Sequence, residues 1–209
     1  VYVFFTHALT CGVIMNLQFD VHVSIPVPDS QGAAITVEFW VRTRVHQHSW
    51  HDAGLFWWNG ETSAGSGNFT NNNRFGLYKP HSLHVCVHSG GCHNTGVKVN
   101  DGKWHHLAVS WESAGGRVRV YLDGTLRHSK NGYYTNTRLV GSGQVVLGAL
   151  TGASGPVADK SKHLSGDIDE VRVWAFARSA KQIAATHDKV LMSPTHAGNV
   201  APSAMAMAM

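Results

Sequence analysis

Two aspartates in a strand-like segment are the first residues whose spacing could support acid–base chemistry. Asp167 and Asp169 are two positions apart, so on a β-strand their side chains would share one face, whereas Glu170 would point to the other. Retaining glycoside hydrolysis needs two carboxyl groups about 5 Å apart on one side of the bound sugar. The chain holds only 13 acidic residues, and the longer acidic pattern of such hydrolases is missing here. We therefore predict no catalytic residues, and hydrolysis is the least favoured function.

Histidine is frequent, with 15 residues in the chain. His46 and His48 would share a strand face, and His51 or Asp52 could add a third ligand for zinc. His-x-His is also common in exposed loops and edge strands, so we interpret these histidines as solvated and predict no metal ligand. The same interpretation applies to a second group, formed by His81, His84 and His88.

Aromatic and amide side chains around residues 57–73 could bind a sugar. Trp57 and Trp58 are adjacent, so on a strand one ring points into the core and the other outward, where it could stack on a sugar. Asn72 and Asn73 offer amides for hydrogen bonds to hydroxyl groups. These four residues are the predicted ligand-binding set. Asn68 begins an Asn-x-Thr sequence and is the predicted N-glycosylation site.

The three cysteines provide evidence on the cellular compartment of the protein. Cys86 and Cys92 flank Val-His-Ser-Gly-Gly, so a hairpin would bring them to bridging distance, and a disulfide would indicate an oxidising compartment. The alternative is two free thiols. Cys11 is left over, either buried or paired with another chain.

A pair of adjacent strands indicates the fold class. Residues 101–111 and 116–124 alternate apolar with polar side chains, and 112–116 between them is a turn rich in glycine. Asp123-Gly124 then opens a second tight turn, because this dipeptide favours two-residue hairpin loops. The pattern predicts a β-meander with one face on a core.

The rest of the chain supports an all-β protein. Residues 59–73 are too polar for a core and are predicted as a long loop. One helix is predicted, with Ser179 as N-cap and its end at Leu191. Further strands are predicted at 17–20, 21–25, 35–43, 54–58, 75–78, 83–87, 144–148 and 166–174.

Composition limits the classes of partner. The chain has 209 residues, of which 43% are hydrophobic and 14% charged, with 22 glycines, as expected for a turn-rich β protein. The net charge of +4 comes from scattered basic residues, so neither nucleic acid nor a membrane surface is an expected partner. No apolar run is long enough to span a membrane. We divide the chain into 1–15, a first strand or processed leader; 16–192, a sandwich; and 193–209, a Pro/Ala/Met-rich tail.

The strand motifs, taken as a set in chain order, resemble laminin-G-like domains of the concanavalin-A-like superfamily, with pentraxins as close relatives. They are Leu17–Asp20, Val37–Val41, Asp101–Trp111, Val120–Gly124, Val146–Gly148 and Gly166–Trp174. The resemblance implies an antiparallel β-sandwich of jelly-roll type; together with the helix predicted from Ser179, the expected fold is this sandwich with one short C-terminal helix.

The same resemblance implies calcium binding by an acidic cluster after the strand that ends at Gly148. This chain has Leu150-Thr151-Gly152 there, and calcium prefers carboxylate ligands, so we predict no cofactor. The paired cysteines of pentraxins are absent as well.

The predicted function is a non-catalytic recognition or adhesion module of the extracellular space or cell surface. It would bind a glycan or a protein through the loops of the sandwich. The alternative is a structural subunit of a larger assembly of several chains. The tail at 193–209 is expected to be disordered in isolation, and a neighbouring chain would hold it in such an assembly.

Overall fold

The computed structural model describes residues 2–5, 9–11, 33–44, 53–61, 69–88, 91–139, 143–150 and 162–189. Several predictions lie outside these residues: the strands at 17–25, the zinc ligands at 46–52, the glycosylation site Asn68 and the tail. None of the helices in the described ranges is long and apolar enough to cross a membrane.

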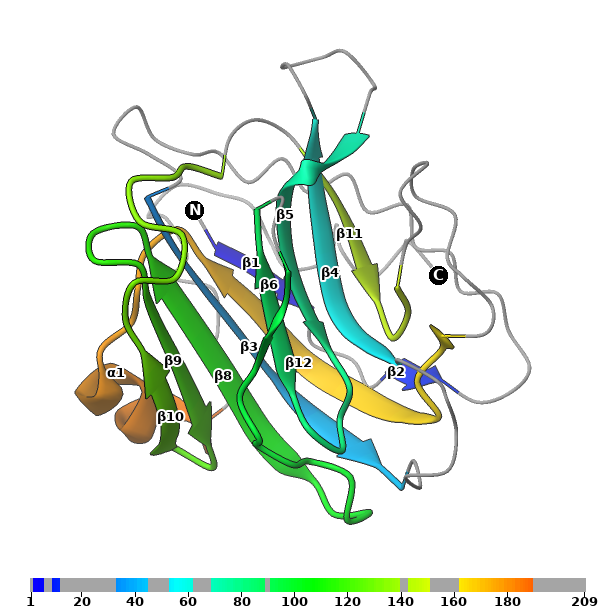
Figure 1. The fold of residues 1–209 in the computed structure, drawn as a ribbon. Coiled ribbons are helices and arrows are strands. Elements are labelled where there is room, and N and C mark those ends of the chain that lie inside the picture. Colours follow the sequence, from blue (N-terminus) through cyan, green and yellow to red (C-terminus); the bar gives the residue numbers. More distant parts are fainter. Residues whose placement is uncertain are drawn as a thin grey trace, which may run out of the picture.

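The described strands form two antiparallel sheets that face each other (Figure 1). The large sheet has the order β1-β12-β3-β8-β9-β10, with β2 also paired to β12, and the small sheet has the order β11-β4-β5-β6-β7. The strands of the large sheet are β1 (Tyr2–Phe5), β2 (Leu9–Cys11), β3 (Ala34–Thr43), β8 (His105–Glu112), β9 (Arg117–Leu122), β10 (Thr125–Lys130) and β12 (Gly166–Trp174). Those of the small sheet are β4 (Gly54–Glu61), β5 (Phe69–Tyr78), β6 (His84–Val87), β7 (His93–Asn94) and β11 (Gly143–Leu147). The predicted antiparallel sandwich is confirmed.

The predicted meander is β8, β9 and β10. Asp123 and Gly124 join β9 to β10 with φ angles of 51° and 74°, the left-handed conformation that a tight hairpin turn of this kind requires. Asp123 also accepts a hydrogen bond through Oδ1 from the backbone N–H of His106, 2.9 Å away. The turn therefore has both the residues and the side-chain contact that stabilise it.

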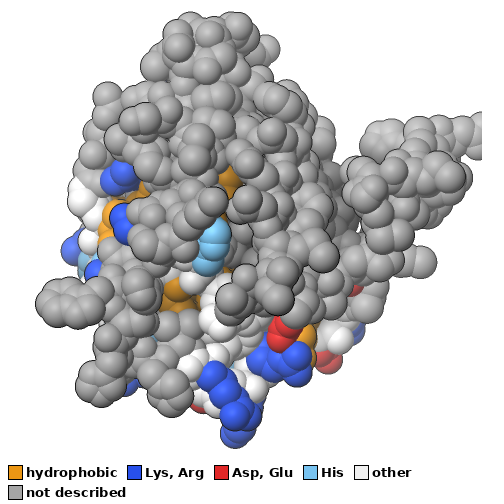
Figure 2. Space-filling model, turned by 90° about the vertical axis from the view of Figure 1, so that its right-hand side faces the viewer, with side chains coloured by type: hydrophobic (Ala, Val, Ile, Leu, Met, Phe, Trp, Pro, Cys, Tyr) orange, Lys and Arg blue, Asp and Glu red, His pale blue; other side chains and the backbone are white. Residues whose placement is uncertain are grey.

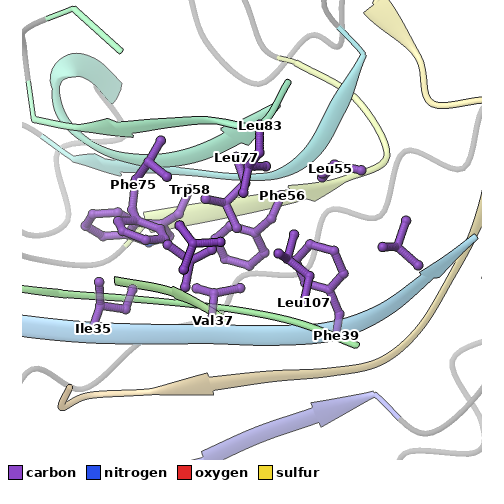
Figure 3. Close-up of a cluster of buried hydrophobic side chains, with 14 of the residues drawn as sticks. Ile35, Val37, Phe39, Leu55, Phe56, Trp58, Phe75, Leu77, Leu83 and Leu107 are labelled. Atoms are coloured by element: carbon purple, nitrogen blue, oxygen red, sulfur yellow. The ribbon is translucent and has the colours of Figure 1, made fainter. Parts of the chain in front are cut away.

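Apolar side chains from both sheets fill the space between them (Figure 3). Ile35, Val37, Phe39 and Val41 alternate along β3 and are all at most 4% exposed, as the period of two predicts. They pack against small-sheet residues that include Phe56, Trp58, Phe75 and Leu77. This core holds the two sheets in place and fixes which side chains point outward.

Part of the outer face of the large sheet, around Glu38, is also buried. Glu38 is 0% exposed, and its Oε1 accepts a hydrogen bond from Arg178 Nη1. Its Oε2 lies 3.4 Å from His106 Nε2 and 3.8 Å from Arg172 Nη1. Burial alone would raise the pKa of Glu38, but the nearby His106 imidazole and the hydrogen bond and charge of Arg178 outweigh burial and lower it. We call these four residues the Glu38 cluster.

The single described helix, α1 (Ala180–Thr186), covers this face. Ser179 is its N-cap, as predicted, and forms a capping box with Gln182. Ile183, which is 0% exposed, packs against Ala108 and Tyr121 of the large sheet. The predicted end at Leu191 is wrong, because the helix ends at Thr186.

The early end of α1 has a contact that the sequence does not reveal. Arg172 Nη2 donates a hydrogen bond to the Lys189 carbonyl oxygen over 2.6 Å, which holds the chain after the helix against the sheet. Residues 186–188, Thr-His-Asp, also have only modest helix propensity.

The predicted loop at 59–73 is shorter than expected. β4 continues to Glu61 and β5 begins at Phe69, so the asparagine-rich run belongs to a strand. The strands pair at Asn59↔Arg74 and Glu61↔Phe69, with a register irregularity between the two pairs. Polar residues can extend a hairpin in this way because backbone hydrogen bonds, which any residue makes, hold its end together.

Candidate ligand-binding face

Strand alternation brings rings and polar groups to the outer face of the small sheet. Phe56 and Trp58 point into the core from β4, so Trp57 between them points outward. Phe75 and Leu77 likewise point inward from β5, so their neighbours Arg74 and Tyr78 point outward. We call this surface the small-sheet face and define it by Trp57, Asn59, Arg74, Tyr78, His84 and Cys86.

The Trp57 ring is held flat against the sheet. A Cβ placed on Gly76 would lie 2.3 Å from Trp57 Cε3, so the ring occupies the space that a side chain on β5 would fill. Trp57 Nε1 donates a hydrogen bond to Asn59 Oδ1 over 2.9 Å. The Arg74 guanidinium lies 5.4 Å from the Trp57 ring centroid, and the Tyr78 ring meets it edge-on with centroids 6.4 Å apart.

Trp57 is consequently only 6% exposed, whereas Arg74 and Tyr78 are half-buried. A molecule approaching this face meets the guanidinium and the phenol first. The buried indole beneath them acts as a rigid support that fixes their positions. Lys79 Nζ lies 5.4 Å from the Tyr78 ring centroid as well, so the described part of this face offers two cations and aromatic edges on a regular sheet.

The guanidinium of Arg74 is partly removed from solvent. Burial lowers the pKa of Arg74, while Tyr133, Tyr134 and Tyr78 act in the opposite direction. Arginine nevertheless stays protonated at neutral pH. Burial also raises the pKa of Tyr133 to about 12, so this phenol is uncharged at neutral pH. Such a site favours ligands with carboxylate or hydroxyl oxygens, which a guanidinium binds through paired N–H groups.

A disulfide closes one border of the face. Cys86 on β6 is bonded to Cys92 just before β7, as predicted. Cys86 packs with Trp57 and Leu150, and Tyr78 and Cys92 contact the same group. The bridge therefore links the edge of the small sheet to the support under Arg74 and Tyr78.

The structure separates the residues of the predicted ligand-binding set. Trp57 is the outward ring of the tryptophan pair, and Trp58 lies in the core, 1% exposed, where it offers no surface to a ligand. The backbones of Asn72 and Asn73 lie in β5, two strand positions and one before Arg74. Their part in binding stays a prediction.

The carboxylates first considered for catalysis have structural partners. Asp167 Oδ2 lies 2.7 Å from Arg42 Nη2, and the Arg42 guanidinium is 5.0 Å from the ring centroid of Trp104, which is 37% exposed. Asp169 accepts a hydrogen bond from the backbone N–H of Glu170. Figure 2 shows one side of the molecule, where basic, acidic and hydrophobic side chains lie next to one another along the lower edge.

His81, His84 and His88 do not converge on a metal. Among the described residues, no group of three or more histidine, cysteine, aspartate or glutamate side chains has the arrangement of a metal site. His84 instead makes a 2.7 Å hydrogen bond from Nδ1 to the Ser82 carbonyl oxygen and lies against Tyr78. Leu150, where the family resemblance places calcium ligands, is 8% exposed and packs with Trp57 and Cys86 of the small-sheet face.

Sequence reasoning missed Arg74 and Tyr78 as members of the face. Both were available from the alternation of Phe75 and Leu77, which assigns their neighbours to the outer side. The prediction of a loop at 59–73 left Arg74, at the border of that loop, without an assignment to a strand face. The packing of Arg74 over Trp57 depends on the pairing of β4 with β5.

Known proteins resemble this chain in sequence and in structure. The sequence profile of a family described as the concanavalin A-like lectin/glucanases superfamily, in its laminin-G form, matches residues 18–184. C-reactive protein of Rattus norvegicus is 35% identical over 92 residues, which cover 43% of this chain and 38% of that protein. Adhesion G protein-coupled receptor D2 of Homo sapiens is 32% identical over 83 residues, which cover 40% of this chain and 9% of that protein. The chain thus spans less than half the length of these relatives.

Two solved structures are similar in fold. The native heptameric SAP-like pentraxin from Limulus polyphemus gives a TM-score of 0.57 at 17% identity and covers 75% of this chain and 70% of its own. The CBM40 of the Ruminococcus gnavus IT-sialidase, bound to α2,3-sialyllactose, gives a TM-score of 0.53 at 12% identity and covers 74% and 83%. At these identities the likeness concerns the fold.

Proposed function

Because this chain belongs to the laminin-G-like branch of the concanavalin A-like lectin/glucanase superfamily, we propose that it is a non-catalytic recognition module that binds a glycan on the small-sheet face. The observation that carries the proposal is the placement of Arg74 over the buried indole of Trp57, with the Tyr78 ring edge-on to the same indole. We propose that the asparagine amides of β5 contribute to the site.

The side chains of the small-sheet face match the chemical groups of a sugar. A sugar presents C–H surfaces that pack on aromatic rings, and hydroxyl or carboxylate oxygens that accept hydrogen bonds from a guanidinium. Arg74 and Tyr78 offer both within one sheet surface. The fold is known to hold a glycan in the CBM40 bound to α2,3-sialyllactose, which supports a glycan as the ligand class.

The contacts of Asp167 and Asp169 favour a binding function over hydrolysis. Asp167 is paired with Arg42, and Asp169 is bonded to the adjacent backbone, so neither is arranged as an acid or nucleophile beside an open sugar site. An extracellular setting is supported by the Cys86–Cys92 bridge, since disulfides persist in oxidising compartments, and by similarity to an adhesion receptor.

A glycan array tests the proposal. The protein should bind a defined set of glycans, and EDTA should leave that binding unchanged. Arg74→Gln, which removes the charge and keeps the stem, should weaken binding about 10- to 100-fold, the value of one charge-assisted hydrogen bond.

Phe176→Ala is the matched control, because Phe176 is an exposed aromatic residue, 40% accessible, next to Trp174 of the large sheet. Its binding should equal that of the wild type. Equal binding by Arg74→Gln and the wild type would contradict the proposed site, and loss of all binding in EDTA would contradict a calcium-independent mode.

A further inference from the structure

Two histidines face each other across the open edge of the sandwich. His93 lies on β7, the last strand of the small sheet, and His128 lies on β10, the last strand of the large sheet, in the described topology. Their Nε2 atoms are 2.9 Å apart, and their ring centroids are 5.0 Å apart. This is a direct side-chain link between strands of the two sheets.

The backbone directs both rings into this seam. His93 pairs with Val85, and His128 pairs with Val120; both valines are 0% exposed core residues, and cross-strand partners share a face of their sheet. A register shift between Leu126 and His128 turns His128 to that side. Irregularities of this kind commonly re-aim a side chain at a functional site.

We propose that His93 and His128 form a two-histidine site for a divalent transition metal such as Zn²⁺, with water completing the coordination. Zinc–nitrogen bonds of about 2.0–2.1 Å at a tetrahedral angle place two ligand nitrogens about 3.3 Å apart. The observed 2.9 Å separation therefore has to widen by only about 0.4 Å. Imidazole nitrogen is a ligand that zinc, copper and nickel all accept.

The protonation state of the pair suits a ligand role. Burial, followed by the positive charge of Lys130, lowers the pKa of both His93 and His128, and His84 acts in the same direction on His93. Both rings are therefore neutral at pH 7.4, as metal binding requires. The ring of Tyr133 also lies beside the pair, with its centroid 5.9 Å from that of His93. The flanking Tyr133 donates its hydroxyl to the Val85 and Gly91 carbonyl oxygens, so this phenol stays protonated beside the site.

Metal binding needs no net loss of a proton. In the metal-free pair, one Nε2–H donates to the other Nε2 lone pair. On binding, that proton moves through water to Nδ1 of the same ring, and both Nε2 lone pairs then coordinate the metal. The charge of Lys130 opposes the cation, and only two protein ligands are present, so we expect an affinity in the micromolar range and not that of a closed structural site.

Thermal unfolding with Zn²⁺ tests the site. At pH 7.4, ZnCl₂ at ten times its dissociation constant should raise the Tm of the wild type by about 3–6 °C, since it binds the folded state only. His93→Asn and His128→Asn should each abolish this rise, and the double variant should lose no more than either single variant. That pattern is the signature of one shared ion.

The other histidines of the chain require a control. His105→Asn removes a histidine bonded to Asp101 and Asp123 elsewhere and should keep the full rise in Tm. At pH 5.5 the rise should disappear in every protein, because protonated imidazole does not bind metal.

A second measurement uses the wild-type protein alone, so it does not depend on whether a variant folds. In ¹H–¹⁵N spectra of the histidine rings, substoichiometric Cu²⁺ should broaden the His93 and His128 signals before all others. A Tm rise that persists in His128→Asn, or broadening that begins at other rings, would overturn the proposal.

Discussion

Replacing Glu38 with glutamine should destabilise the protein by about 3 kcal/mol. Removal of one partner from a buried ion pair typically costs about 3–5 kcal/mol, because the remaining charge stays buried without compensation. In the Glu38 cluster, Arg172 would keep Glu170, whose Oε2 lies 3.2 Å from Arg172 Nη2. Arg178 would keep only neutral acceptors on Gln182 and Thr186. Arg178 is therefore the main residue whose buried charge loses its compensation, which places the expected destabilisation near the lower end of that range.

The assay is urea unfolding at pH 7, followed by tryptophan fluorescence. The midpoint should fall while the m-value stays constant, since the surface exposed on unfolding is the same. Glu112→Gln on the neighbouring strand is the control: Glu112 is part-exposed, 3.1 Å from Arg117, and its loss should cost less than about 1 kcal/mol. A loss at Glu38→Gln as small as that control would refute the reasoning.

The same substitution has a pH signature. The pKa of Glu38 is lowered in the folded state, so its stabilisation is fully present above the unfolded-state pKa and is lost as the pH falls through the folded-state pKa. Wild-type stability should therefore fall more steeply in acid than that of Glu38→Gln. Parallel curves would show that this carboxylate is not the group that titrates.

Three further outcomes are expected. Replacing Cys86 and Cys92 together with serine should cost about 2 kcal/mol in urea unfolding, because the bridge closes a short loop with a sequence separation of 6; an unchanged midpoint would show that the bridge does not restrict the unfolded chain. Gly76→Ala should cost about 1–3 kcal/mol, since the new methyl group meets the Trp57 ring, and the indole fluorescence should shift; a variant as stable as the wild type would mean that the ring is free to move. Burial alone would lower the pKa of His105, but its two aspartate partners raise it, so its stabilisation is present below the unfolded pKa near 6.5 and is lost as the pH rises through the folded value. His105→Asn should remove that part of the pH dependence, and identical profiles would contradict it.

Much of the fold follows from local patterns. The alternation of Ile35, Val37 and Phe39 predicts the buried face of β3, and Asp123-Gly124 predicts the turn after β9, because each signal is complete within a few residues. The N-cap of the helix is predictable for the same reason. Its end was not, because a hydrogen bond from Arg172 on a distant strand fixes the chain there.

The second buried face illustrates what local patterns miss. Glu38 alternates with the core residues of β3 and therefore looks like a solvent-facing position. Its burial depends on Arg178, 140 residues later in the chain, and on the helix that follows it. A sequence pattern records which side of a strand a residue occupies but not what covers that side.

The small-sheet face is only partly predictable from the sequence. The adjacency of Trp57 and Trp58 predicts that one ring points outward, and pairing with β5 decides that it is Trp57. The sequence does not predict that Arg74 and Tyr78 cover that ring, because their contacts form across strands. The ring thus becomes a support for the groups that we propose to bind the ligand, whereas the sequence suggested a surface for stacking.

The most direct test of glycan binding on the small-sheet face is a ¹H–¹⁵N NMR titration with the glycan that binds best on the array. The indole N–H of Trp57, bonded to Asn59, and the backbone amides of Gly76 and Tyr78 report on this face. We predict that these signals shift first and saturate together, while the amides of α1 stay unchanged. Saturable binding with shifts confined to α1 and the large sheet would contradict the account.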